Sequence, residues 1–565
     1  MSQEKSHENS QASDRALYLF VAVLGILLVS KKLDELKPFV THWIETHLWL
    51  TAGLAASIGL GLAAIGYAAF QVLNDKYKLR QYIASVTAEA PGSVYAGRSD
   101  SGERIFIPIE ARRMHTQVIG TTNAGKSESV IIPWAIGDMK DKRGFVIVDG
   151  KADKSFIHKM YAYAKKLNRA EDFKVFSLQD PNRSCTFNPL LGGTPEEVAE
   201  RVFNSFEFDN SYYESVQYEI FSQVLRIFDK AEVKPTFLRI YQGIKSPSAL
   251  YDMALSSEDD ALIRWTSGFK TLSASDREEK TSGLLSSLSH FAFGAHSKLF
   301  NTDEPDIDLE YALKESELVY FQLPVLKAAY LGKATGKLVL QCLQSAVANR
   351  HGEDKNEDAV EEKEHPFFSV YLDDFTEYLY SGFVSLLNKS RSANVGIVFA
   401  HQALGDIKTL GEDVATSILT NSNIKIIMRG NDPDSAEYFA KMIGTKSGER
   451  MTERAETGAL GNSRTGQGSI REVEEFIVHP NVIKRNMGVG EALVVIPHRC
   501  GITTVKLKFA MLPPLPRQEL PRPAEKPILG LNINPAQEAV KENASESNNT
   551  SVAFTETETK KQEVA

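Results

Sequence analysis

The chain has 565 residues, of which 42% are hydrophobic and 24% charged, so it is long enough to bury a large core in about two to four domains. Its formal net charge of −9 at pH 7 argues against a protein coated in basic surface for nucleic acid, although a local basic channel is compatible with it. The three cysteines, Cys185, Cys342 and Cys500, are far apart and form no Cys-x-x-Cys or His/Cys cluster. This argues against a zinc site or a disulfide framework and favours reduced thiols.

Residues 1–75 predict a membrane anchor with two transmembrane helices, at about 14–30 and 48–73. The second stretch has 26 consecutive uncharged residues, long enough to span a bilayer with tilt, whereas the first is uncharged only over Ala16–Ser30 and is close to the lower length limit. A cleaved signal peptide is the alternative for the first stretch. However, Lys31-Lys32 follow this stretch directly, and no small-x-small cleavage site does. Basic residues after the second span favour the cytoplasm for the main body, although lysines between the spans weaken that argument.

A phosphate-binding loop (P-loop, or Walker A motif) lies between two apolar runs at residues 118–132. It reads Gly120-Thr121-Thr122-Asn123-Ala124-Gly125-Lys126-Ser127. The glycines let the backbone turn its N–H groups toward phosphate oxygens, and the positive end of the following helix adds to the same anion site. Lys126 is placed to reach the β- and γ-phosphates of ATP, and the Ser127 hydroxyl to bind Mg²⁺. The alternative is a glycine-rich turn that caps an ordinary helix.

Apolar runs typical of buried parallel strands recur along the rest of the chain. They are residues 145–149, 173–177, 318–322, 367–372, 395–400, 424–428 and 493–497, the last being the final strand expected. Residues 195–305 lack such runs and carry apolar residues at helical spacing instead. We therefore expect an α/β fold, with a P-loop nucleotide-binding domain at 76–194 and 306–512 and an all-α inserted domain at 195–305.

Two carboxylates, Asp373 and Asp374, stand at the end of the apolar run 367–372. Asp373 is placed to hold Mg²⁺, and Asp374 to orient or deprotonate an attacking water. The alternative is a strand that ends in two acidic turn residues.

Two further residues are candidates for sensing and stabilising the γ-phosphate. Arg391 precedes the run 395–400, where a cation delivered across a subunit boundary would neutralise charge on the transferred phosphate; the alternative is a solvated surface charge. Gln402 follows the same run, where an amide can sense the γ-phosphate; the alternative is a satisfied amide at a strand end.

Four other segments complete the chain. Gly332–Lys337 has glycines and lysines but the wrong spacing for a second P-loop, and it predicts the start of a helix. The charged segment 352–364 predicts a solvated loop, and the glycine-rich segment 446–471 a mobile loop that either lines a channel or is simply solvated. Residues 513–565 are rich in Pro and then in Ser, Thr, Asn and Glu, so we expect a disordered tail.

With these motifs the chain resembles the type IV coupling proteins of the TraD/TraG group, most closely the conjugative TraD branch, over about residues 10–510. Two N-terminal spans, an early P-loop, a helical insertion and a late acidic strand end occur in the order typical of the group. The segments 146–154, 431–437 and 471–475 are also similar to family segments.

The resemblance implies a RecA-like domain that binds ATP and Mg²⁺ through Lys126 and Ser127. By the same likeness, Asp373 and Asp374 form the acidic pair, Arg391 is the arginine supplied in trans and Gln402 is the γ-phosphate sensor. One departure is Asp374, because the family commonly has Glu there. The shorter side chain retracts the expected base by about one methylene, which puts the strength of catalysis in doubt.

The family likeness implies a homo-hexameric, multi-pass ATPase of the bacterial inner membrane with a cytoplasmic main body. Such a protein recruits a relaxase–DNA complex, contacts inner-membrane components of a type IV secretion system and drives single-stranded DNA into its channel. The tail is a candidate docking segment for accessory proteins, or else a spacer.

Two other functions stay open. A double-stranded DNA pump of the chromosome-segregation type (FtsK/HerA-like) shares the motor chemistry, but it usually carries more spans and a C-terminal winged helix. A non-catalytic receptor, in which nucleotide only gates the binding of protein substrates, is kept open by Asp374 in place of Glu.

Overall fold

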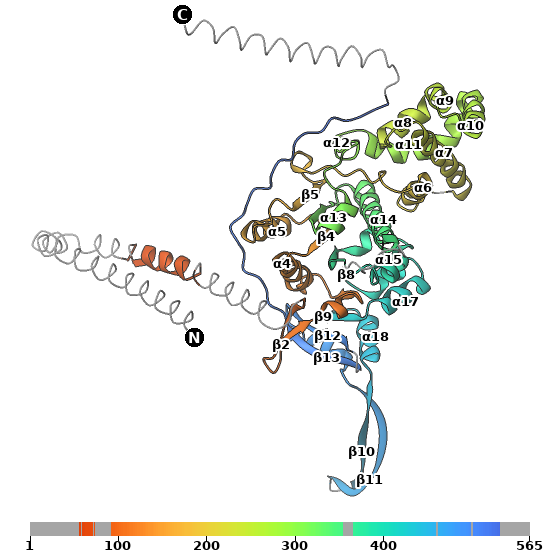
Figure 1. The fold of residues 1–565 in the computed structure, drawn as a ribbon. Coiled ribbons are helices and arrows are strands. Elements are labelled where there is room, and N and C mark those ends of the chain that lie inside the picture. The colour runs from red at the N-terminus through yellow and green to blue at the C-terminus, as the bar shows by residue number, and fades with distance from the viewer. Residues whose placement is uncertain are drawn as a thin grey trace, which may run out of the picture. The chain divides into compact units, whose positions relative to one another are not determined.

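The computed structural model describes residues 56–57, 59–71, 73, 92–208, 210–353, 365–458, 461–498 and 501–531 (Figure 1). The chain forms two compact units, Met1–Arg80 and Gln81–Ala565.

In the first unit, residues 59–71 are helical and carry exposed apolar side chains, such as Leu60 and Ile65. Within the described residues, no helix is both long and apolar enough to cross a membrane. The predicted span at 14–30 lies outside the described residues. The predicted span at 48–73 is described only from residue 56 onward, with gaps.

The described part of the second unit contains a mixed sheet of 11 strands in the order β2-β1-β13-β12-β9-β3-β8-β7-β4-β6-β5. The strands are β1 (Val94–Ser99), β2 (Arg104–Ile107), β3 (Thr116–Ile119), β4 (Gly144–Asp149), β5 (Phe173–Ser177), β6 (Leu318–Gln322), β7 (Phe368–Asp373), β8 (Val395–His401), β9 (Ile424–Met428), β12 (Glu491–His498) and β13 (Gly501–Lys508). From β9 to β5 all neighbours pair in parallel, whereas β12, β13, β1 and β2 extend the sheet by antiparallel pairing.

The predicted α/β core is confirmed, because the seven apolar runs expected to be strands correspond to β4, β5, β6, β7, β8, β9 and β12. Every residue of β4, β7 and β8 is buried, as parallel strands covered on both faces require. One expectation is wrong: the run at 493–497 is not the last strand, since β13 returns beside it from a hairpin.

Helices cover both faces of the sheet, with α4 and α5 on one face and α14, α15 and α17 on the other (Figure 1). In the described part of the second unit, the helices outside residues 195–305 are α3 (Ile109–Arg112), η1 (Ser127–Ile131), α4 (Ile132–Lys140), α5 (Lys154–Lys166), η2 (Pro181–Arg183), α13 (Leu309–Glu315), α14 (Ala329–Glu353), η3 (Phe375–Tyr378), α15 (Phe383–Ser390), α16 (Leu404–Lys408), α17 (Glu412–Asn421), α18 (Pro433–Ile443) and α19 (Pro480–Arg485). Gly332–Lys337 lies within the first turns of α14, as predicted, and most of the segment 352–364 lies outside the described residues.

Residues 195–305 are helical wherever they are regular, and they gather at one end of the sheet domain (Figure 1). The helices are α6 (Pro195–Phe203), α7 (Ser211–Lys230), α8 (Phe237–Lys245), α9 (Pro247–Ser256), α10 (Asp260–Thr271), α11 (Ala274–Ala292) and α12 (Ser297–Phe300). A capping box starts α6, where Thr194 and Glu197 each hydrogen-bond the backbone N–H of the other. Aromatic rings form the centre, with Phe237 stacked on Phe291 at a centroid distance of 4.4 Å.

The segment 446–471, expected to be a loop, instead belongs to a two-stranded antiparallel ribbon that projects from the body (Figure 1). Its strands are β10 (Thr445–Gly458) and β11 (Gly461–Phe476). The strands were not predicted because residues 445–476 lack the alternation of apolar and polar residues that identifies a strand.

Residues 513–531 also differ from the expected disordered tail, whereas residues 532–565 lie outside the described residues. Residues 513–531 form an extended segment, here called the strap, that passes α5 and reaches the helical insertion (Figure 1). At α5, Tyr163 donates a hydrogen bond to the carbonyl of Pro513 at 2.9 Å. In the insertion, the side-chain oxygen of Gln242 accepts from the backbone of Leu531 at 2.6 Å. The composition alone did not predict this, because the strap is held by partners far away in the sequence. Both its backbone and side chains such as Lys526, which pairs with Asp306 at 2.8 Å, make these contacts.

A buried ion pair joins the first helix of the sheet domain to its centre. Arg112 donates two hydrogen bonds of 2.8 Å to Asp138, and both side chains are at most 2% exposed. The hydroxyls of Ser369 and Tyr371 on β7 donate to the same carboxylate at 2.7 and 2.6 Å. Burial opposes ionisation of Asp138, but the charge and hydrogen bonds of Arg112 outweigh it and lower the pKa from 3.8 to about 2.

We predict that Arg112→Met lowers the free energy of unfolding of the sheet domain by about 3–5 kcal/mol, because it leaves Asp138 charged, buried and unpaired. Denaturant unfolding monitored by circular dichroism measures the change. Since the folded-state pKa of Asp138 lies below its unfolded value, the stabilisation should be present above about pH 4 and be lost as the pH falls toward about 2. Lys441→Ala, which removes an exposed ion pair with Glu437, should leave the midpoint unchanged. Unfolding of the two variants at the same midpoint denaturant concentration would contradict the prediction.

Candidate nucleotide-binding site

The P-loop follows β3 at the carboxyl edge of the parallel strands, where α/β sheets present residues to ligands. Gly125 has φ +98°, and a Cβ atom there would lie 2.8 Å from Ser129 Oγ and 3.2 Å from Gly490 N. A side chain is therefore excluded both by backbone conformation and by space. The helix that follows opens with the π-helical turn η1 before it continues as α4. The strand–loop–helix placement predicted from the sequence is found.

Lys126 is 5% exposed, and its ammonium lies inside the curve of the P-loop. It donates hydrogen bonds to the carbonyl oxygens of Gly120 at 2.7 Å and Thr121 at 3.3 Å. Burial lowers the pKa of Lys126, and the nearby ammonium of Lys151 lowers it further, whereas three carboxylates oppose the shift. An anion placed between these two cations would relieve their repulsion.

The structure brings Asp373 at the end of β7 to the start of η1. Its Oδ2 accepts a hydrogen bond of 2.7 Å from Ser127 Oγ, and its side chain is only 2% exposed. Its other oxygen, Oδ1, is buried without a hydrogen-bond partner among the described residues. A buried, unsatisfied carboxylate oxygen beside a hydroxyl is a donor set that suits a hard cation such as Mg²⁺.

The turn after Asp373 is fixed by a buried tyrosine. Tyr378 donates to the backbone carbonyls of Asp373 at 2.8 Å and Val148 at 3.0 Å, which joins the ends of β7 and β4. Asp374 then adopts a left-handed conformation with φ 48°, so the two acidic side chains leave the strand in different directions. Adjacent carboxylates can in this way have different partners.

Asp374 is paired with Lys151, which comes from the end of β4. Lys151 Nζ lies 2.9 Å from Asp374 Oδ1. The loop that carries Lys151 is organised by Asp149, whose buried carboxylate accepts hydrogen bonds from the backbone N–H groups of Lys151, Ala152 and Asp153 at 2.9–3.1 Å. Burial, together with the charge of Asp373, raises the pKa of Asp149 to about 7.

Gln402 lies beside the P-loop, as predicted from its place after β8. Thr122 Oγ1 donates to Gln402 Oε1 at 3.3 Å, and the Gln402 backbone N–H donates to Asp406. The preceding His401 is buried, which lowers its pKa to about 4 and keeps it neutral. Its Nε2 lies 2.8 Å from the amide nitrogen of Gln117, so the Gln402 strand is tied to β3.

Arg391 is not near the P-loop of its own chain. It ends α15 before β8 begins, and it is exposed. Burial lowers the pKa of His115, and the charge of Arg391 adds to that effect, so Arg391 lies near the residue that precedes β3. Because β3 and β8 are parallel, this is the amino edge of the sheet, about 20 Å from the loop across the 7 residues of β8.

Of the predicted site residues, the structure brings together the P-loop, Asp373, Asp374 and Gln402, and it places Arg391 at the opposite edge. Reasoning from the sequence assigned no role to Lys151 or Asp149. The sequence feature that could have identified them is the position of Asp149 at the end of the apolar run 145–149. Since β4 pairs in parallel with β7, Asp149 lies opposite Asp373 at the same sheet edge.

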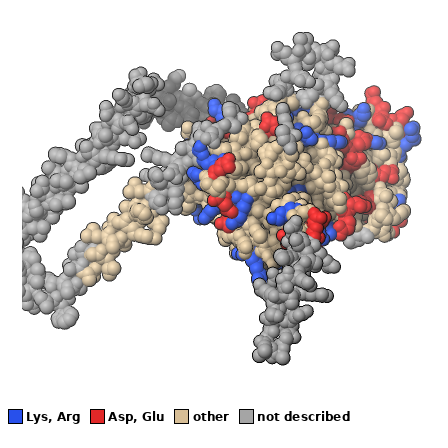
Figure 2. All heavy atoms as spheres, turned by 90° about the horizontal axis from the view of Figure 1, so that it is seen from below, with Lys and Arg blue, Asp and Glu red and all other residues tan. Residues whose placement is uncertain are grey.

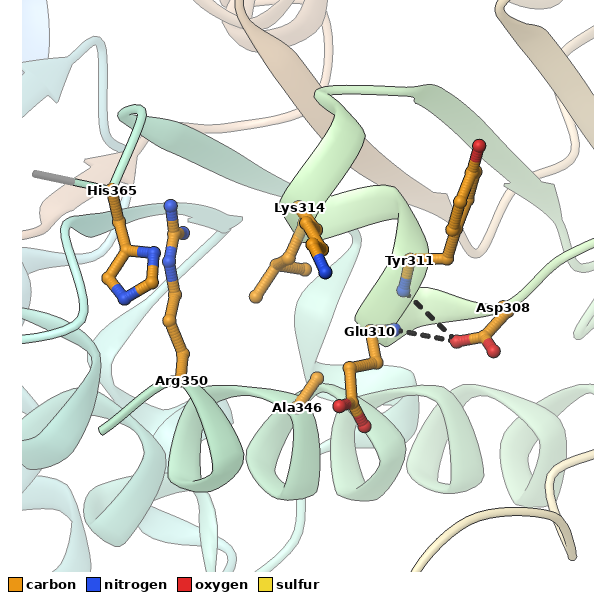
Figure 3. A pocket seen from close by; sticks show the side chains of 8 residues that line it. Asp308, Glu310, Tyr311, Lys314, Ala346, Arg350 and His365 are labelled. Atoms are coloured by element: carbon orange, nitrogen blue, oxygen red, sulfur yellow. Dashed lines mark hydrogen bonds between the residues drawn. The ribbon is translucent and has the colours of Figure 1, made fainter. Parts of the chain in front are cut away.

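A separate pocket of about 240 Å³ lies between α13 and α14 (Figure 3). Arg350 and His365 stand on one side of it, and Asp308, which caps α13, on the other. It contains none of the residues predicted to bind nucleotide.

A family model and a curated relative match parts of this chain. Residues 368–487 match the family model described as "TraM recognition site of TraD and TraG". The type 4 coupling protein DotL of Legionella pneumophila is 21% identical over 400 residues, which is 61% of this chain and 51% of DotL. The chain thus spans about half the length of this curated relative.

Two solved structures of the plasmid and conjugative coupling protein TrwB share the fold. The complex of TrwB with the ATP analogue ADPNP has a TM-score of 0.54 at 14% identity and covers 78% of this chain and 94% of TrwB. Unbound TrwB gives a TM-score of 0.53 at 13% identity, with 77% and 92% covered. The family model, the curated relative and the fold agree, and they confirm that the chain is similar to the type IV coupling proteins of the TraD/TraG group.

Proposed function

We propose that the chain is an ATPase of the type IV coupling kind, which uses ATP and Mg²⁺ to drive transfer of single-stranded DNA. The observation that carries the proposal is the 2.7 Å hydrogen bond between Ser127 and Asp373, which joins the P-loop to the acidic strand end. It is supported by TrwB structures that bind ADP with Mg²⁺ and non-hydrolysable triphosphate analogues.

Each residue of the site has a role in this proposal. The P-loop backbone and Lys126 hold the phosphates, and Ser127 with Asp373 would hold Mg²⁺, which when bound neutralises phosphate charge. Asp374 accepts the proton of a water as the water oxygen attacks the γ-phosphorus and ADP leaves. Gln402, bonded to Thr122, detects whether the γ-phosphate is present.

A ring of six identical subunits supplies what one chain lacks. Arg391 lies at the opposite sheet edge from the P-loop, so it can stabilise the transferred phosphate only across a subunit boundary. A head-to-tail contact between the two edges generates a closed ring when the rotation closes.

The remaining parts are assigned as follows. Residues 1–75 anchor the protein in the bacterial inner membrane by two spans, which the uncharged stretch 48–73 and the exposed apolar helix at 59–71 support. Residues 76–194 and 306–512 form the RecA-like motor in the cytoplasm. Residues 195–305 receive the relaxase–DNA complex, and residues 532–565 are available to accessory proteins.

DNA is gripped through its phosphates without reading sequence. On the face shown in Figure 2, basic and acidic side chains of the described residues are intermixed. In this proposal the cations that grip DNA line the opening of the ring, and inner-membrane components of the secretion system contact its membrane end.

The direct test is phosphate release by the purified full-length protein with and without single-stranded DNA. Acceleration by single-stranded DNA is expected. A protein that binds ATP but never releases phosphate would instead be a nucleotide-gated receptor, and acceleration only by duplex DNA would favour an FtsK/HerA-like pump.

We predict that Lys126→Ala lowers ATP turnover at least about 100-fold, because the β- and γ-phosphates lose their buried cation. Lys441→Ala, an exposed lysine on α18, serves as the matched control and should keep wild-type turnover. Unchanged turnover in Lys126→Ala would remove the P-loop from the reaction.

Asp374→Asn should retain ATP binding, measured by equilibrium titration, but lower turnover by about 100- to 10,000-fold. The amide keeps the size of the side chain but cannot accept the proton. Turnover that survives in this variant would exclude Asp374 as the base.

Subunits with Arg391→Ala and subunits with Lys126→Ala should each be inactive alone and regain turnover when mixed in one ring. A mixed interface can combine an intact P-loop from one subunit with an intact arginine from the next. No recovery at any mixing ratio would show that Arg391 does not act in trans.

A further inference from the structure

We propose that Lys151 is a switch residue that exchanges the Asp374 carboxylate for the γ-phosphate of the bound nucleoside triphosphate. The inference rests on the proposed function of the site and adds a residue to it. Three observations lead to it: the partner of Lys151, its reach and the way its loop is held.

The first observation is the ion pair. Lys151 Nζ lies 2.9 Å from Asp374 Oδ1, and the carboxylate is 14% exposed. A carboxylate held by an ammonium has one of its oxygens occupied, so it is a poorer acceptor for the proton of an attacking water. While this pair persists, the expected base is restrained.

The second observation is that Lys151 lies close to Lys126. Asp149, two residues before Lys151, pairs with Asp373 across β4 and β7, and Asp373 accepts the 2.7 Å hydrogen bond of Ser127, the residue after Lys126. Lys126 is the lysine of the P-loop, so the γ-phosphate that it reaches comes within range of Lys151 as well. With 42% of its side chain exposed, Lys151 is free to change partners. A γ-phosphate carries more negative charge than a carboxylate and accepts more hydrogen bonds, so it competes well for an ammonium.

The third observation is that hydrogen bonds hold the backbone of Lys151 in place, whereas its long side chain is partly exposed. Asp149 binds three successive backbone N–H groups of the loop, and Tyr320 donates to Asp149 at 2.8 Å. The backbone of Lys151 is thus fixed at the sheet edge, opposite the end of β7. Only the long side chain has to move, by rotation about its own bonds, for the exchange to occur.

The exchange has a defined consequence. When the ammonium moves to the γ-phosphate, Asp374 loses its partner and becomes available to water. Since ADP has no γ-phosphate, Lys151 returns to Asp374 after hydrolysis. The restraint on the base is therefore released only when there is a triphosphate to hydrolyse.

The experiment compares the affinities of the full-length protein for Mg²⁺-ADPNP and Mg²⁺-ADP by titration calorimetry. We expect Lys151→Met to weaken ADPNP binding about 10- to 100-fold, as for the loss of a charged hydrogen bond, and to change ADP binding less than about twofold. Lys151→Arg should restore most of the ADPNP affinity. Lys154→Met, three residues further on at the start of α5, makes the same charge change and should affect neither nucleotide.

A double-mutant cycle with Asp374→Asn tests the exchange itself. Asp374→Asn should tighten ADPNP binding in the wild-type background, because it frees Lys151, and should tighten it clearly less in the Lys151→Met background. Equal effects in both backgrounds would overturn the exchange.

The outcomes separate this inference from the proposed function. If Lys151→Met leaves the ratio of ADPNP to ADP affinity unchanged while wild-type protein hydrolyses ATP, the switch is wrong and the ATPase stands. If the ratio changes but wild-type protein releases no phosphate, the switch stands and hydrolysis is wrong. If the protein binds neither nucleotide, both are wrong.

Discussion

The parallel alignment of β3, β8, β7 and β4 is the constraint on which the candidate site depends. Because these strands run in one direction, their carboxyl ends meet at one edge, and the P-loop, Gln402, Asp373 and Lys151 all follow those ends. Although these residues are far apart in the sequence, the parallel pairing of the strands is enough to bring them together. The buried Arg112–Asp138 pair, with its hydrogen bonds to Ser369 and Tyr371, connects α3, α4 and β7 and so helps to keep these strands in place.

The sequence predicted the parts of this arrangement that are buried on both sides. Continuous apolar runs identified the central strands because burial leaves no choice of polar residue there. Elements with a solvent-exposed face were missed for the same physical reason. β10 and β11 form a separate two-stranded sheet whose sequence lacks apolar alternation, and the strap is held by hydrogen bonds and ion pairs to residues far away in the sequence.

The residues of the site likewise divide into those predicted from the sequence and those missed. Ser127 and Asp373 were predicted partners because each belongs to a motif with a fixed place on a strand end. Lys151 was missed because its partner, Asp374, depends on the order of β4 and β7 in the sheet and on the left-handed turn after Asp373. Arg391 was identified from its place before the run 395–400 and from the family resemblance, but only the sheet shows that it lies at the opposite edge from its own P-loop.

The strap sets a limit on how far the sheet domain and the helical insertion can move apart. Its residues form no helix or strand, and a chain can span at most about 3.3–3.6 Å per residue. The length of the strap therefore limits the distance between its two attachment points on α5 and α8. Beyond that limit the two helices can separate only if hydrogen bonds such as those of Pro513 and Leu531 break. The hydrogen bonds at the two ends of the strap therefore oppose any larger separation of the sheet domain and the helical insertion.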